Sequence, residues 1–96
     1  MVEVTDEQIK KGLVTLAIEQ TLLEFGPPAL EKVSNKLFEY YHCYIPDCYK
    51  KPEYLNRVLK ELFGNSHIVI VQLIRRRLED MSTQDSIKNF LAKISE

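Results

Sequence analysis

The chain has 96 residues, of which 45% are hydrophobic and 28% are charged, and its formal net charge is −1. This composition is typical of one globular domain and leaves no room for two cores. No apolar run approaches the roughly 18 residues of a membrane-spanning helix. The polar start MVEVTDEQIKKG is unlike a secretory signal peptide. We therefore expect a single cytoplasmic domain over residues 1–96, without membrane contact.

The first predicted helix covers residues 6–25. Thr5 and Gln8 have the spacing of a capping box, and Gly26 followed by Pro27 marks the end of the helix. Its apolar residues form two stripes, so we expect this helix to pack against more than one neighbour. The first stripe is Ile9, Leu13, Leu16, Ala17 and Leu23, and the second is Val14, Ile18, Leu22 and Phe25.

Two further helices are predicted over residues 28–41 and 52–63. Pro28 and Pro52 suit the first turns of these helices, and Phe63-Gly64 ends the third helix. Pro46 and Pro52 bracket the segment between them, which we interpret as a connector because a proline cannot continue a preceding helix.

The fourth predicted helix covers residues 66–80, with Asn65 or Ser66 as its N-cap. Apolar residues between 68 and 74 cover nearly the whole circumference, which predicts the most buried helix at the centre of the bundle. A fifth helix over residues 84–95, capped by Ser82 or Thr83, has a narrow apolar stripe. The predicted fold is all-α, a compact bundle of about five helices.

The connector region YYHCYIPDCYKKPEYL concentrates the residue types that carry chemistry. Candidate metal ligands are His42, Cys43, Asp47 and Cys48, but zinc sites use closer cysteine pairs with a second pair elsewhere. Adjacent His42 and Cys43 do not supply the geometry of a catalytic pair. We therefore expect no metal, no cofactor and no enzyme. A Cys43–Cys48 disulfide stays open, with free thiols as the favoured alternative.

Two sets of residues are predicted contact surfaces. Aromatic side chains beside lysines are typical of protein interfaces, and this set is Tyr44, Tyr49, Lys50, Lys51 and Tyr54. A basic set could contact phosphates or an acidic partner, and its members are Arg57, Lys60, Arg75, Arg76 and Arg77. We expect the last three arginines to point in three directions, because successive helical residues are about 100° apart.

The favoured partner is therefore a protein or a second copy of the chain. The alternative is a transcription-associated or nucleic-acid-binding helical domain that uses the basic set. The start of the fourth helix, Ile68-Val69-Ile70-Val71, argues against that alternative, because a DNA-reading helix needs polar side chains.

The run DCYKKPEYLNRVLKELFGNSHIVIVQLIRRRLED resembles the Nitrosopumilus output domain family, a family of small archaeal helical domains. The upstream run LVTLAIEQTLLEFGPPALEKVSNKLFEYY is also similar, so the resemblance covers roughly residues 10–96. It implies a non-enzymatic output or interaction module of signalling proteins, and no catalytic residues. The matching positions are Asp47, Tyr49, Pro52, Leu55, Leu59, Phe63, Gly64, Ile70 and Ile74.

Overall fold

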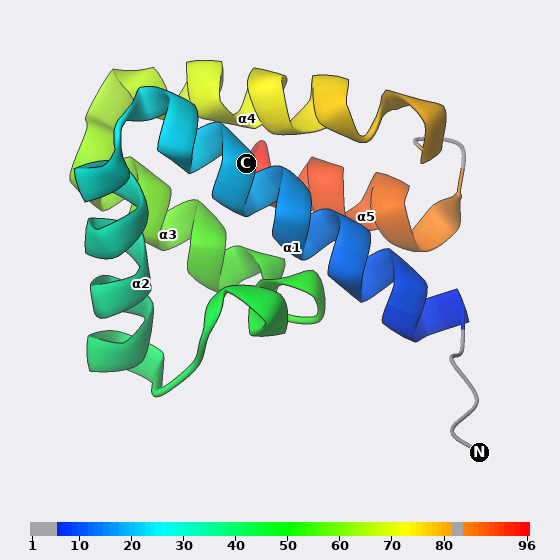
Figure 1. The fold of residues 1–96 in the computed structure, drawn as a ribbon, viewed down its shortest axis with the longest axis horizontal. Coiled ribbons are helices and arrows are strands. Elements are labelled where there is room, and N and C mark those ends of the chain that lie inside the picture. The colour runs from blue at the N-terminus through cyan, green and yellow to red at the C-terminus, as the bar shows by residue number, and fades with distance from the viewer. Residues whose placement is uncertain (1–5, 82–83) are drawn as a thin grey trace.

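The computed structural model describes residues 6–81 and 84–96, and Figure 1 shows that their regular structure is helical throughout. This confirms the predicted all-α bundle of about five helices. None of the helices in the described ranges is long and apolar enough to cross a membrane. The α-helices are α1 (Asp6–Phe25), α2 (Pro27–Tyr41), α3 (Pro52–Phe63), α4 (His67–Arg77) and α5 (Asp85–Ile94). Three short 3₁₀ helices connect them: η1 (Ile45–Tyr49), η2 (Gly64–Ser66) and η3 (Glu79–Met81).

Most helix ends lie where the punctuation residues predicted them. The bounds of α1 and α3 are those predicted, and α2 starts one residue early, at Pro27. The predicted helix over residues 66–80 is shorter, because η2 and η3 take up its two ends. The N-cap of α5 is Gln84, so a cap at Ser82 or Thr83 was placed too early. Those two residues and the predicted cap Thr5 lie outside the described ranges.

Gly26 makes the corner between α1 and α2. Its φ of 131° is a conformation that residues with a Cβ rarely adopt. Its N–H donates to the carbonyls of Leu22 and Leu23 at 3.1 and 3.0 Å, and its own carbonyl accepts from Ala29 at 2.9 Å. One residue therefore ends the first helix and begins the second, so α2 turns sharply across one end of the molecule (Figure 1).

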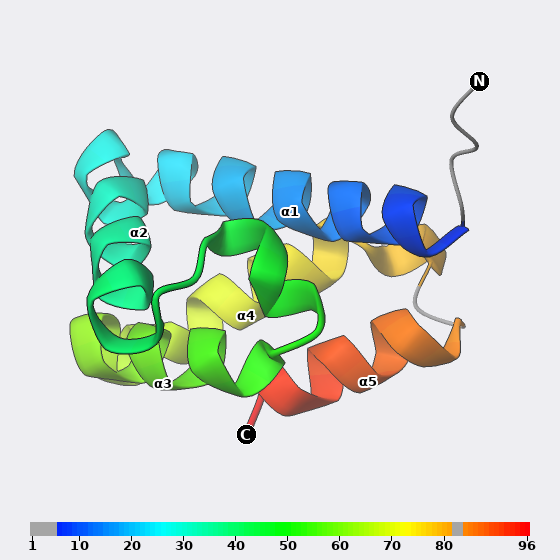
Figure 2. The same ribbon diagram turned by 90° about the horizontal axis from the view of Figure 1, so that it is seen from below.

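The helices form two outer layers. Figure 2 shows α1 alone in one layer, with α3 and α5 in the opposite layer. Helix α4 and η1 lie between the layers, and α1 contacts α2, α4 and η1. The largest fully buried side chains come from all five α-helices. They are Val14, Ile18, Leu22, Leu37, Leu55, Leu59, Ile70, Ile74, Ile87, Phe90, Leu91 and Ile94.

The prediction that the fourth helix is the most buried one, at the centre of the bundle, was wrong. Ile68 and Val69 are 59% and 49% exposed, whereas Ile70 and Ile74 are fully buried. Helix α4 thus buries one face, against α1, α3 and α5. The β-branched run at the start of α4 therefore supplies apolar residues to both the buried and the exposed face of the helix.

The carbonyl oxygen of Ile94 joins three helices. It accepts a hydrogen bond from Asn56 Nδ2 of α3 at 3.0 Å and contacts Nε2 of His67, at the start of α4, at 2.8 Å. Because a carbonyl oxygen can only accept, His67 Nε2 must carry a proton here. Both side chains are buried. The last carbonyls of a helix have no partner within it, so these two donors hold the end of α5.

Replacing Asn56 with alanine should lower the free energy of unfolding by about 1–3 kcal/mol, because it removes a buried donor and weakens the α3–α5 contact. Urea unfolding monitored by circular dichroism measures the change. The matched control is Asn35→Ala on the exposed side of α2, which should stay within about 0.5 kcal/mol of the parent. Equal effects of the two substitutions would contradict the role given to Asn56.

Candidate functional site

The structure separates the residues of the predicted aromatic set. Tyr44, Lys50 and Lys51 are exposed, whereas Tyr54 is half-buried. The Tyr54 ring stacks on that of Tyr41, with centroids 3.9 Å apart and ring planes 3° from parallel. The set therefore does not form one aromatic face, although its exposed members stay available to a partner.

Tyr49 is the member of this set whose placement differs most from the prediction. It is 7% exposed, and its hydroxyl donates to Glu7 Oε2 at 2.8 Å. Burial is the main cause that raises the pKa of its phenol, and the bond to Glu7 also raises it. The side chain thus ties η1 to the start of α1, and it is too buried to contact a partner.

The connector is part of the core. Ile45, Cys48 and Tyr49 of η1 are buried, and η1 packs against α1 and α3. Its start is fixed by Asp47 Oδ2, which accepts from the Tyr44 N–H at 2.8 Å. Asp47 therefore has a capping role, because it satisfies a backbone donor at a helix N-terminus.

A small aromatic cluster does reach the surface beside the connector. The Phe38 ring lies 5.5 Å from the His42 ring and 5.7 Å from the Tyr44 ring, between centroids. Phe38 and Tyr44 are both exposed. The predicted aromatic set included Tyr44 but not Phe38. Phe38 lies within α2 and Tyr44 lies beyond its end, so helical spacing gave no signal that the two rings meet.

The two cysteines are free thiols and both are buried. Burial raises the pKa of both thiols, most strongly that of the fully buried Cys48. A protonated thiol is a poor nucleophile and a poor metal ligand. Among the described residues, no group of three or more histidine, cysteine and acidic side chains is placed to hold a metal ion. Both side chains belong to the hydrophobic core, Cys48 within η1 and Cys43 just before it.

The stability of the protein should fall above about pH 9 in part through Cys48. The native state keeps this thiol protonated, whereas the unfolded chain exposes it and releases the proton. The unfolded state then binds fewer protons, so the free energy of unfolding falls by up to about 1.4 kcal/mol per pH unit. Urea titrations between pH 7 and 10.5 should therefore give a shallower decline for Cys48→Ala than for the parent. Parallel curves for the two proteins would refute this.

The basic set is distributed over two sides of the molecule. Lys60 Nζ donates to the Glu96 carbonyl and Arg75 to Ser95 Oγ at 3.0 Å, so these two meet at the end of α5. Arg77 turns the other way, donating to Gln20 Oε1 at 3.1 Å and pairing with Glu24 of α1. Arg57 and Arg76 are exposed. The five side chains do not make one surface.

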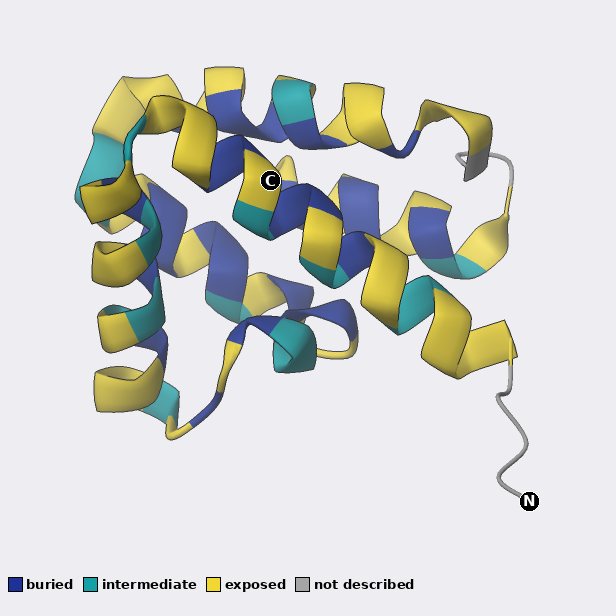
Figure 3. Cartoon of the chain, in the orientation of Figure 1, coloured by how far each residue is buried: buried dark blue, intermediate teal, exposed yellow. Residues whose placement is uncertain are grey.

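The first apolar stripe of α1 is the largest feature that sequence reasoning did not place. Ile9, Leu13, Leu16 and Leu23 are 48%, 40%, 50% and 46% exposed. In the second stripe Val14, Ile18 and Leu22 are fully buried and Phe25 is exposed, whereas Ala17 is the one buried member of the first stripe. At about 100° per residue the four exposed side chains and Gln20 lie within about 80° of arc. Figure 3 shows this outer side of α1 as exposed along the helix.

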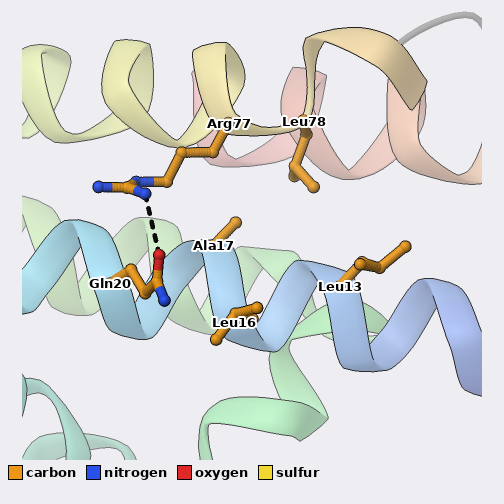
Figure 4. A pocket seen from close by; sticks show the side chains of 6 residues that line it. All are labelled: Leu13, Leu16, Ala17, Gln20, Arg77 and Leu78. Atoms are coloured by element: carbon orange, nitrogen blue, oxygen red, sulfur yellow. Dashed lines mark hydrogen bonds between the residues drawn. The ribbon is translucent and has the colours of Figure 1, made fainter.

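Two hollows flank this stripe. Figure 4 shows the one between α1 and α4, about 330 Å³ in volume, where Arg77 reaches over to Gln20 and Leu78 lies opposite Leu13 and Ala17. A shallow hollow of about 630 Å³ lies on the other side, between α1 and Pro46 of η1. Leu16 lines both hollows. We call Ile9, Leu13, Leu16, Gln20 and Leu23 the α1 stripe.

Gly12 lies beside the α1 stripe, in the interior of a 20-residue helix. A Cβ added at this position would meet nothing within 4 Å. Glycine in a helix interior lowers stability relative to alanine, and no contact within the described residues requires it here. The glycine leaves open space on the outer side of α1.

Replacing Gly12 with alanine should raise the free energy of unfolding by about 0.5–1 kcal/mol, because the unfolded chain loses freedom and the folded chain gains no clash. Denaturant unfolding of dilute protein measures the gain. Gly64 is the matched control, since its φ is +55° and alanine there should destabilise by about 1 kcal/mol or more. Destabilisation by Gly12→Ala would show that the site is not open.

Comparison with known protein families, with curated proteins and with solved structures found no match for this chain.

Proposed function

We propose that the chain is a non-catalytic protein-interaction module and that the α1 stripe is its contact surface. The single observation that carries this proposal is the exposure of four large aliphatic side chains along one face of α1. Monomeric soluble proteins expose single apolar residues freely, but contiguous apolar patches mark interaction sites. A straight apolar face on a helix suits a partner helix, which contacts it every third or fourth residue.

The driving force available on this surface is moderate. Full burial of a leucine or isoleucine side chain is worth about 1.5–3 kcal/mol, so covering the exposed half of one contributes about 1 kcal/mol. Four such side chains give about 4 kcal/mol before any polar contacts and before the entropy lost on association. The stripe therefore supports reversible association, as is usual for signalling contacts.

The role we propose for the module is the output part of a signalling protein, which the resemblance to the Nitrosopumilus output domain family implies. A nucleic-acid function has less support, because Arg75 and Arg77 are engaged on different sides of α4. Proteins that bind a phosphate backbone gather their basic side chains on one face.

The proposal predicts that a photo-crosslinking residue at Gln20, in the middle of the α1 stripe, forms a defined covalent adduct with a protein in the native host. The second substitution Leu16→Glu should abolish the adduct, because it places a charge in the apolar contact. Denaturing electrophoresis and mass spectrometry of the adduct measure both results.

Two controls make the result specific. A photo-crosslinker at Lys32, on the exposed side of α2, should not give the same adduct. The thermal unfolding midpoint of Leu16→Glu should remain close to that of the parent, because Leu16 is half exposed. Absence of any adduct that depends on Leu16 would overturn the proposed function.

A further inference from the structure

We infer that the α1 stripe binds a second copy of the chain, with the two α1 helices side by side and antiparallel. This inference rests on the proposed function, and it names the partner that the stripe receives. Three features of the α1 stripe support a second copy as the partner: its spacing, the free space around it and the charges at its edge.

The spacing of the stripe is that of a coiled-coil seam. Ile9, Leu13, Leu16, Gln20 and Leu23 follow one another at intervals of 4, 3, 4 and 3 residues. This alternation keeps a helix face against another helix over its length, and a polar residue at one seam position fixes the register. A stripe that repeats in this way is complementary to a copy of itself. In the antiparallel pair, Leu13 lies opposite Leu23 of the second copy and Leu16 lies opposite Gln20.

The position of α1 leaves room for this contact. The helix forms an outer layer by itself, with its two termini at opposite ends (Figure 2). Gly12 borders the stripe and carries no side chain, which allows another backbone to approach closely. The same register places Leu23 of the second copy near this glycine, so the open space on α1 receives the other helix.

The charges beside the stripe select the antiparallel orientation. Lys10, Ala17 and Glu24 form the edge of the stripe that faces α4, seven residues apart. In an antiparallel pair this edge meets the same edge of the second copy, so each Lys10 approaches Glu24 of the other chain. A parallel pair would instead bring Glu19 against Glu24 of the other chain twice. Like charges in such positions oppose association.

The contact is small and the dimer is therefore weak. A helix of 20 residues is about 30 Å long, so a strip of that length buries area near or below the lower limit of about 1,200 Å² for stable complexes. Glu19 also lies near the two-fold axis, where it approaches Glu19 of the second copy. We expect dissociation in the micromolar range, with monomers in dilute solution.

Sedimentation equilibrium of the purified chain, from about 1 µM to 1 mM, tests the inference. The apparent mass should rise with concentration from 11.2 kDa toward twice that value. Leu16→Glu should keep the monomer mass throughout, and Gly12→Ala should weaken the association although it stabilises the fold. Glu19→Gln should strengthen the association by about twofold, because it removes a like-charge contact.

A charge swap distinguishes a second copy from any other partner. Lys10→Glu and Glu24→Lys should each weaken the dimer, and the double variant should restore it, since each chain then supplies both reversed charges. Glu24 also pairs with Arg77, so each variant is checked for an unchanged circular dichroism spectrum. A different partner helix would not recover binding in the double variant.

Two outcomes would overturn the inference. A strict monomer at 1 mM, with the Leu16-dependent crosslink to a different protein still present, would leave the proposed function standing and exclude the second copy. A dimer whose affinity is unchanged by Leu16→Glu and by the charge swap would show that self-association uses another surface. If the crosslinked adduct from Gln20 has the mass of two chains, both proposals are supported together.

Discussion

The arrangement of the helices depends on the carbonyl oxygen of Ile94. Helix α5 lies in the opposite layer from α1 (Figure 2), and its last buried carbonyl receives donors from α3 and from α4. A buried carbonyl without a donor would cost about 1–3 kcal/mol, so an arrangement that brings Asn56 and His67 to this oxygen is favoured. Because α4 also packs against α1, the same contact positions the surface against which α1 packs.

That surface covers only part of the apolar side chains of α1. Val14, Ile18 and Leu22 are completely buried against it, whereas the four aliphatic side chains of the α1 stripe stay 40–50% exposed. A helix can bury one face of limited arc against a single layer. The α1 stripe is therefore apolar surface beyond what the fold requires, and it determines what the outer layer can contact.

Local sequence signals predicted most helix ends, whereas the burial of individual side chains depends on tertiary contacts that the sequence does not show. Gly26 and Pro52 control the backbone of their own turns, so the bounds of α1 and α3 could be predicted. The burial of Tyr49 could not, because it depends on Glu7, 42 residues away. The two stripes of α1 were visible in the sequence, but their equal hydrophobicity gave no sign of which one faces the core. Likewise, Ile68 and Ile70 are alike in sequence and opposite in burial.

Among the described residues, His42 and Gly12 depart from the local preferences of a helix, and only His42 has a reason inside the fold. His42 has a positive φ of 53°, which is unfavourable for a residue with a Cβ. Its N–H donates to the Phe38 carbonyl at 2.9 Å and so closes the end of α2, which accounts for the strain. Gly12 is unfavourable in the middle of α1, yet no described contact uses its small size. Residues that break a local rule without compensation inside the fold are expected at functional surfaces, and Gly12 borders the one long apolar stripe that α1 leaves uncovered.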